Sequence, residues 1–343
     1  MTCYHPLKGF VLGISENGKK DLKITSYDAD HVEVYENGSI NVCFNSSRSP
    51  YAFKVIKDFI QIPCGKCVGC RLRYSRQWAD RCMLELQYHE SSYFVTLTYN
   101  DENLPTSEWL DSETGEVGTS HSLVKRDVQL FLKRLRRYYK FDNHLMYYCA
   151  GEYGSKSARP HYHLIIFGLR LDDLKVYKTN KELQYSLFTS PFLEKCWGKG
   201  FVVVGLVTWE TCAYTARYIM KKQYGASADV YNQLNIIPEF TTMSLKPAIG
   251  KRFFEEHGLD MFKNGHYNLS SEKGSRKIFP PDYFIKKLEE IDEDLYSDIK
   301  NIRGLVAKNT QALKLCQTDR EYMDYLADTE SSLKKRIASL KRL

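Results

Sequence analysis

A short segment near the middle of the chain, Arg159–Gly168 with the sequence RPHYHLIIFG, constrains the fold more than any other. Two histidines separated by one residue, His161 and His163, open a run of residues that favour β-structure. Because residues i and i+2 of a strand share a face, both imidazoles are expected to project side by side. Two imidazoles fixed on one strand begin a site for a divalent metal; the alternative is an ordinary histidine pair on a surface or in a core.

The segments around this strand alternate between the two periodicities of secondary structure. Apolar runs predict strands, and amphipathic runs predict helices. The expected strands lie at 93–99, 145–150, 162–169 and 201–207, and the expected helices at 71–90, 123–140 and 210–223. Their order, close to β-α-β-β-α-β with antiparallel strands, predicts the α+β class, with helices packed on one sheet.

The remaining segments differ in character. Residues 1–60 read as short strands and turns, with hairpin signals at Asn17-Gly18 and Asn37-Gly38. The polar segment 101–122 reads as a long surface loop, and 170–190 reads as a variable region. From Pro280 to Leu343 the pattern is helical throughout.

Composition places the chain among globular proteins. Its 343 residues are 43% hydrophobic and 27% charged, and no stretch approaches the roughly 18 consecutive apolar residues of a membrane span. The N-terminal residues MTCYHPLKGFVLG lack the pattern of a signal peptide, so an intracellular location is expected. Ten cysteines in that compartment indicate thiols or metal ligands rather than disulfides.

Three of these cysteines form a C-x₂-C-x₂-C motif at Cys64, Cys67 and Cys70. This spacing suits one tetrahedral zinc ion, which needs a fourth ligand; Cys3 is the first choice and His5 the second. Cys82 falls on the apolar side of a helix and is expected in the core. Three free thiols in a turn, or an iron–sulfur cluster, are the alternatives.

Positive charge is concentrated on the helix expected at 123–140. Within it, seven basic residues face the single acid Asp127: Lys125, Arg126, Lys133, Arg134, Arg136, Arg137 and Lys140. A second basic group follows the cysteine motif at Arg71, Arg73, Arg76 and Arg81. Clustered Lys and Arg suit a phosphate backbone, and a solvated helix face is the alternative.

Two further elements carry chemistry. Glu152 lies in GEYG, on the expected turn between two neighbouring strands, which could bring its carboxylate beside the histidines. In AYTARYIMKK, Tyr214 and Tyr218 are four residues apart and share one helix face, with Lys221 and Lys222 a turn further on. A nearby ammonium lowers the pKa of a phenol and so favours the nucleophilic phenolate; core packing is the alternative.

Together, the strand FVTLTYND, the segment GEYG…RPHYHLIIFG and the helix YTARYIMKK resemble motifs I, II and III of the HUH rolling-circle replication initiators. The upstream segment IPCGKCVGCRLRYSRQWADRC is similar to the replication initiation proteins of gokushovirus-type microviruses, which are single-stranded DNA phages. The resemblance covers about Cys3 to Gly225.

The resemblance implies an antiparallel β-sheet of the HUH endonuclease type, ferredoxin-like or RRM-like, with a helical C-terminal extension. It implies a metal-dependent single-stranded DNA endonuclease that also rejoins strands. One Mg²⁺ or Mn²⁺ ion would be held by His161, His163 and Glu152. Tyr218 would attack first to form a 5′-phosphotyrosyl link, Tyr214 would act second, and Lys221 would stabilise the phenolate or the phosphate. DNA would be held by Lys133, Arg134, Arg136, Arg137 and Lys222.

The expected partners are single-stranded origin DNA and the host helicase and polymerase, in the bacterial cytoplasm and away from membranes. The chain divides in this reading into an N-terminal segment with the cysteines (1–70), a catalytic domain (71–225), a connecting region (226–280) and a helical C-terminal region (281–343). A relaxase or transposase, a non-catalytic zinc-stabilised DNA-binding protein and a structural virion component remain as alternatives. No P-loop motif, which a helicase module would carry, is present.

Overall fold

The computed structural model describes residues 3–16, 20–111, 113–154, 157–180, 185–217, 222–271 and 274–339. The chain forms two compact units. One comprises Met1–Arg73 with Leu305–Leu343, and the other comprises Tyr74–Gly304. The four-part division expected from the sequence stays a prediction.

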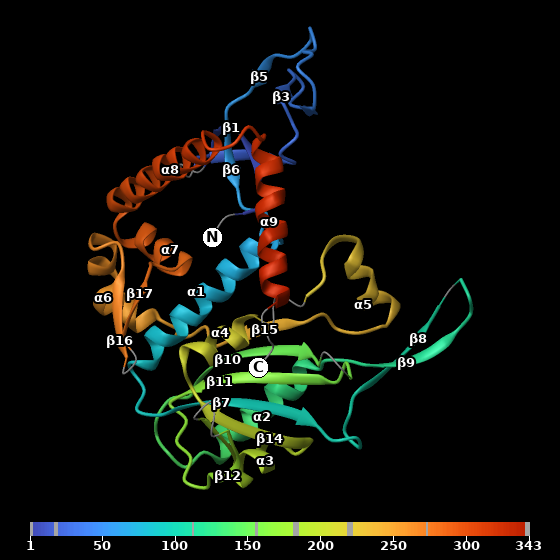
Figure 1. The fold of residues 1–343 in the computed structure, drawn as a ribbon, viewed down its shortest axis with the longest axis vertical. Helices are drawn as coiled ribbons and strands as arrows, with labels where there is room; N and C mark the ends of the chain where they lie inside the picture. The colour runs from blue at the N-terminus through green and yellow to red at the C-terminus, as the bar shows by residue number, and fades with distance from the viewer. Residues whose placement is uncertain are drawn as a thin grey trace. The chain divides into compact units, whose positions relative to one another are not determined.

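An antiparallel sheet of seven strands forms the centre of the Tyr74–Gly304 unit (Figure 1). Its spatial order is β12-β13-β14-β7-β11-β10-β15. The strands are β7 (Ser92–Tyr99), β10 (Met146–Tyr153), β11 (Pro160–Phe167), β12 (Lys175–Asn180), β13 (Tyr185–Thr189), β14 (Gly200–Leu206) and β15 (Phe240–Met243). With the helices described below, this sheet confirms the α+β class and the four strands expected around the histidines.

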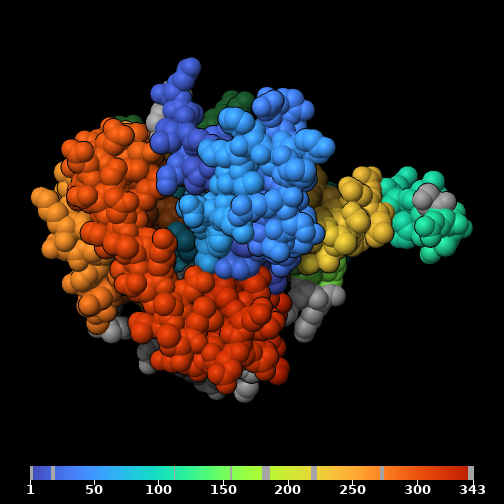
Figure 2. All heavy atoms as spheres, turned by 90° about the horizontal axis from the view of Figure 1, so that it is seen from above, coloured from blue at the N-terminus to red at the C-terminus, as the bar shows by residue number. Residues whose placement is uncertain are grey.

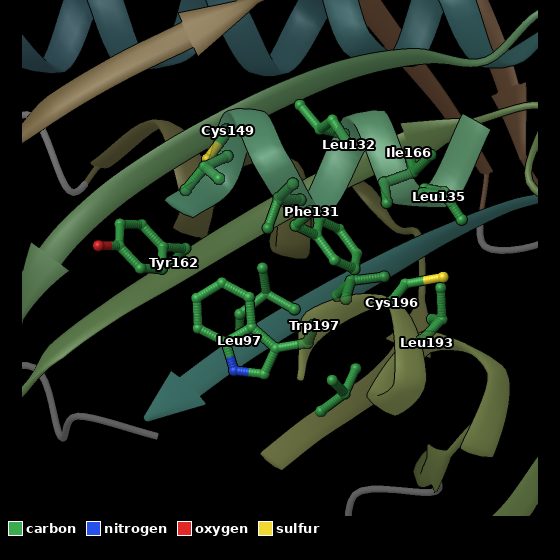
Figure 3. Close-up of a cluster of buried hydrophobic side chains, with 14 of the residues drawn as sticks. Leu97, Phe131, Leu132, Leu135, Cys149, Tyr162, Ile166, Leu193, Cys196 and Trp197 are labelled. Carbon is green, nitrogen blue, oxygen red and sulfur yellow. The ribbon is translucent and has the colours of Figure 1, made fainter. Parts of the chain in front are cut away.

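Two helices cover one face of this sheet. These are α2 (Lys125–Tyr138), which confirms the expected basic helix, and α3 (Pro191–Trp197). Alternate residues of β11, from Tyr162 onward, point into the core beneath them, which is drawn in Figure 3. Phe131 of α2 and Trp197 of α3 are fully buried there. Because neighbouring strand residues point to opposite faces, His161 and His163 belong to the other face.

That second face, the histidine face, is covered by α1 (Val68–Leu86) and α4 (Trp209–Arg217). Its apolar end is a second core, in which Ile165 and Phe167 of β11 pack with Cys82 of α1 and with α4 residues such as Cys212. The placement of Cys82 in the core is therefore confirmed. The histidines occupy the opposite end of β11, at its start.

One segment was expected to be a loop and is instead a β-hairpin. Strands β8 (Thr106–Leu110) and β9 (Val117–His121) pair there, with Trp109 opposite Gly118. A Cβ at position 118 would collide with the indole of Trp109, so glycine permits this pairing. Figure 2 shows the hairpin projecting next to α5 (Asp229–Gln233), and Asn235 Nδ2 donates to the carbonyl of Glu108 at 3.0 Å.

The variable region also contains structure, because β12 and β13 pair as the outer strands of the sheet. Beyond β15, a third core includes Phe253 and Phe284. Its surrounding elements are α6 (Lys251–Lys263), β16 (Tyr267–Ser271), β17 (Gly274–Ile278), α7 (Asp282–Ile291) and α8 (Glu293–Leu315), and a short 3-10 helix, η2 (Gly225–Ala228), precedes α5.

The other unit contains two small sheets and α9 (Tyr322–Ser339). The first sheet has the order β2-β1-β6 and the second β4-β3-β5. The strands are β1 (Leu7–Ile14), β2 (Lys20–Thr25), β3 (His31–Val34), β4 (Ile40–Cys43), β5 (Lys54–Ile56) and β6 (Phe59–Ile62). The short strands expected in 1–60, the Asn37-Gly38 turn and the helices expected after Pro280 are confirmed.

The second expected turn, at Asn17-Gly18, lies outside the described residues. None of the helices within the described ranges combines the length and the apolar character needed to cross a bilayer.

Candidate active site

Strand register brings a carboxylate to the histidine pair. Glu152 of β10 is directly opposite His161 of β11, and Ala150 is opposite His163, so all four side chains share the histidine face. Glu152 Oε1 lies 3.1 Å from His163 Nε2. Glu152 and His163 are only 5% and 6% exposed, so this pair is largely withdrawn from water. Glu152 is part of strand β10 rather than of the turn after it.

Two threonines of the neighbouring strand β7 set the orientation of the imidazoles. Thr96 Oγ1 lies 3.1 Å from His163 Nδ1, and Thr98 Oγ1 lies 3.3 Å from His161 Nδ1. A hydroxyl at Nδ1 fixes the ring, and Nε2 becomes the atom through which each imidazole would bind a metal. These residues were missed as site residues, although the alternating Thr-x-Thr of β7 beside the His-x-His of β11 is a readable signal.

Aromatic rings enclose His163 from two sides. Phe94 stacks on it, with ring centroids 5.8 Å apart and an interplanar angle of 6°. Tyr214 of α4 meets it edge to face, with centroids 5.6 Å apart and an angle of 77°. Because Tyr214 remains 41% exposed, its ring is in contact with both the histidine and solvent. The structure thus brings Tyr214 to the histidine face, whereas Tyr218 and Lys221 lie outside the described residues.

The donor set of this site is two imidazoles and one carboxylate. Such a mixed set fits a divalent ion that accepts both nitrogen and oxygen, and Mn²⁺ accepts both more readily than Mg²⁺, which prefers oxygen. The ring centroids of His161 and His163 are 6.5 Å apart. Among the described residues, two other groups bring three or more ligand atoms within 4.8 Å of one another. The role of the histidine pair and Glu152 as metal ligands stays a prediction.

The first of those groups is the expected cysteine cluster. Cys3 joins the three cysteines of the motif, as expected, while His5 instead lies with its Nε2 2.9 Å from Glu330 Oε2. Cys67 Sγ and Cys3 Sγ are 4.0 Å apart, close to the edge of about 3.8 Å between two thiolates on a tetrahedral zinc ion. The four thiols therefore have the composition and spacing of a closed zinc site.

Backbone amides support the sulfur atoms of this cluster. The amide of Cys64 donates to Cys3 Sγ, and the amide of Tyr4 donates to Cys67 Sγ, each at 3.3 Å. A hydrogen bond from the Cys3 thiol, together with that amide, lowers the pKa of Cys67 to about 3. Burial raises the pKa of Cys70 to about 11. Amide donors of this kind stabilise the anionic sulfur that a metal requires.

The basic residues of α2 lie on the sheet face opposite the histidines. Arg134 is engaged within the fold, since its Nε donates to the carbonyl of Cys196 at 2.5 Å and its Nη2 to that of Trp197 at 2.7 Å. Lys133, Arg136 and Arg137 are exposed. Lys222 is half-buried, with its ammonium 5.8 Å from the ring centroid of Tyr224. DNA binding by these residues stays a prediction.

Comparison with known proteins identifies relatives of the whole chain. The model of a family of replication-associated proteins, named after its ORF2 members, matches residues 92–223, which include the histidine pair, Glu152 and Tyr214. The chain is 36% identical to "Replication-associated protein ORF2" of Spiroplasma virus 4, over 100% of this chain and 98% of that protein.

Two further relatives match shorter parts. "Replication-associated protein VP4" of Bdellovibrio phage phiMH2K is 34% identical over 64% of this chain and 65% of its own. "Replication-associated protein ORF4" of Chlamydia phage 1 is 30% identical over 49% of this chain and 40% of its own. No solved structure matches the chain.

Proposed function

This chain belongs to the replication-associated protein family of gokushovirus-like microviruses, and we propose that it starts rolling-circle replication by nicking and rejoining one DNA strand. The observation that carries the proposal is the meeting of Glu152, His163 and Tyr214 on one sheet face. A carboxylate, an imidazole and a phenol at one partly open position suit covalent cleavage of a phosphodiester.

The chemistry proceeds by exchange of one phosphorus–oxygen bond for another. A tyrosine oxygen attacks the scissile phosphorus while the bond to the 3′ oxygen breaks. The tyrosine loses its proton, the 3′ oxygen gains one, and the 5′ phosphate stays on the protein. Because no water or nucleotide is consumed, the same bond exchange in reverse rejoins the strand. The released 3′-OH would serve as primer for the host polymerase.

Two tyrosines are assigned to this exchange. Tyr218 takes the first cleavage and Tyr214 the second, because Tyr218 lies three residues before Lys221, whose ammonium stabilises the phenolate. Support for Tyr214 also comes from its contact with His163. Two nucleophiles allow one to hold the growing strand while the other releases a unit-length circle.

The metal would be held by His161, His163 and Glu152. When bound, a Mn²⁺ or Mg²⁺ ion polarises the phosphodiester and orients it as a Lewis acid. Thr96 and Thr98 keep the imidazoles in the orientation that leaves Nε2 for such an ion. Phe94 lies flat against His163 and limits water on that side of the ring.

The experiment is incubation of the protein with single-stranded oligonucleotides from the viral origin and Mn²⁺, resolved on a denaturing gel. We expect a protein–DNA adduct that disappears with chelator and in the Tyr214→Phe/Tyr218→Phe double variant. Tyr177→Phe is the matched control, because Tyr177 is an exposed tyrosine on the outer strand β12 and should leave the adduct unchanged.

The competing function is a zinc-stabilised DNA-binding protein without catalysis, which the cysteine cluster favours. Tight binding of the same oligonucleotides with no adduct under any metal condition would establish that function and refute the nickase.

A further inference from the structure

The small β4-β3-β5 sheet contains a buried polar cluster that the nicking reaction does not use. His31 and Glu33 are i and i+2 on β3, and Cys43 of β4 is directly opposite His31. All three side chains therefore share one face. His31 is 0% and Glu33 1% exposed, while Cys43 is half-buried.

A buried ionisable face is costly in so small a sheet. The other face carries the apolar core, which includes Val32 and Ile56. Burying a carboxylate and an imidazole costs several kcal/mol unless they are paired, hydrogen-bonded or bound to a metal. The three ligand atoms of His31, Glu33 and Cys43 all lie within 4.8 Å of one another.

The distances within the cluster fit ligands around an ion better than a direct ion pair. His31 Nε2 lies 3.4 Å from Glu33 Oε1, beyond the 2.7–2.9 Å of a charge-assisted hydrogen bond. In a tetrahedral zinc site, with metal–ligand distances of about 2.0–2.1 Å, two such ligand atoms are about 3.3 Å apart. The observed separation equals that edge within about 0.1 Å.

The groups behind the cluster orient its members from outside. Asp30 Oδ2 lies 2.8 Å from His31 Nδ1, an arrangement that turns Nε2 toward the other two residues. Glu33 Oε1 accepts from the amide of Ser49 at 2.7 Å, and Oε2 accepts from Tyr35 Oη at 2.8 Å. A carboxylate–imidazole pair behind the metal and hydrogen bonds to the ligating carboxylate are the usual outer contacts of a metal site.

We propose that His31, Glu33 and Cys43 form a second zinc site, separate from the cysteine cluster. One thiolate, one imidazole and one carboxylate are the three ligand types of Zn²⁺, and water would complete the tetrahedron. The ion links β3 to β4 and, through Ser49, to the segment that follows β4. Its role is to stabilise this sheet, whose apolar core is small.

The test counts zinc in the full-length protein by mass spectrometry of the metal after dialysis into metal-free buffer. We expect two zinc ions per chain, and one in both Cys43→Ser and Glu33→Gln, the second of which keeps the size of the side chain. Cys316→Ser is the matched control, because Cys316 is an exposed free cysteine, and it should retain both ions.

Three results would overturn the site. They are one ion in the wild type, an unchanged count in Cys43→Ser, and loss of the second ion in His163→Ala instead. If Cys43→Ser does not fold, alkylation of the wild type decides. Cys43 should react with iodoacetamide only after zinc is chelated, whereas equal reaction before and after chelation would refute zinc binding there.

Discussion

The orientation of both imidazoles in the candidate active site depends on the hydroxyl groups of Thr96 and Thr98. Replacement of either threonine by valine keeps the shape of the side chain and removes the hydrogen bond. Loss of such an outer contact typically weakens metal binding by about 10–100-fold. We expect Thr96→Val and Thr98→Val to raise, by that factor, the Mn²⁺ concentration needed for half-maximal adduct formation.

The control for these variants is Thr106→Val, on the exposed β8–β9 hairpin, which should leave the Mn²⁺ requirement unchanged. Equal Mn²⁺ requirements for the wild type and for both site variants would show that the threonines do not position the metal ligands.

The thiol of Cys67 makes a prediction about pH. Because its pKa is lowered to about 3, the metal-free protein carries a Cys67 thiolate at neutral pH, and acidification removes it only near that value. An ordinary thiol with a pKa of about 8.5 gains thiolate steeply between pH 6 and pH 8. The alkylation rate of Cys67, followed by peptide mass spectrometry, should therefore be nearly constant over that range. A tenfold rise per pH unit, as for N-acetylcysteine, would contradict the lowered pKa.

Alternation along a strand made part of the site predictable. It placed His161 and His163 on one face, and Glu152 reached them through the pairing of adjacent strands. The cluster at His31 could not be found in this way, because it depends on which residue of β4 lies opposite β3. Polar residues on a four-residue strand look like an exposed edge until the covering segment at Ser49 is seen.

At the level of elements, α2 combines a structural arginine with exposed bases. Arg134 donates to the carbonyls at the end of α3, so Arg134→Ala should lower the free energy of unfolding by about 1.5–3 kcal/mol, measured in urea. Lys133→Ala, one residue away and exposed, should change it by less than about 0.5 kcal/mol. Equal losses of stability in the two variants would contradict the assignment of Arg134 to the fold.

The same pair of residues separates stability from DNA binding. If Lys133 contacts a phosphate, Lys133→Ala should reduce the slope of log affinity against log salt concentration by about 1. An unchanged slope would remove Lys133 from the DNA-binding surface.

Elements with a buried apolar face were predictable from periodicity, whereas exposed pairings were not. Helix α2 has a fully apolar inner side at Phe131 and Leu135, and its bounds differ from the expected ones by two residues at each end. The β8–β9 hairpin lacks such a side, and its pairing rests on Trp109 over Gly118. Its polar sequence therefore resembles that of a loop.

At the level of the whole molecule, the two compact units contain different candidate metal sites. The cysteine cluster belongs to the unit that includes Met1–Arg73, and the histidine pair belongs to the Tyr74–Gly304 unit. Structural zinc contributes directly to folding, whereas a Mn²⁺ or Mg²⁺ site in an enzyme need not. Loss of the cysteine cluster should therefore act first on its own unit.

We expect Cys64→Ser, or removal of zinc by a chelator, to make residues 20–73 sensitive to limited proteolysis while residues 92–217 resist it. Cys316→Ser should behave as the wild type, because Cys316 is exposed and lies outside the cluster. Cleavage in residues 92–217 before any cleavage in residues 20–73 would show that zinc does not stabilise the first unit.

The central claim is that a tyrosine of this chain becomes covalently linked to DNA, and peptide mapping of the adduct tests it most directly. Trypsin cleaves after Arg217, so Tyr214 falls in the peptide 200–217 and Tyr218 in the peptide 218–221. After nuclease trimming, mass spectrometry should find a nucleotide phosphate on Tyr218, on Tyr214, or on both. DNA that is cut without a nucleotide on either peptide, or with one on another residue, would contradict the mechanism.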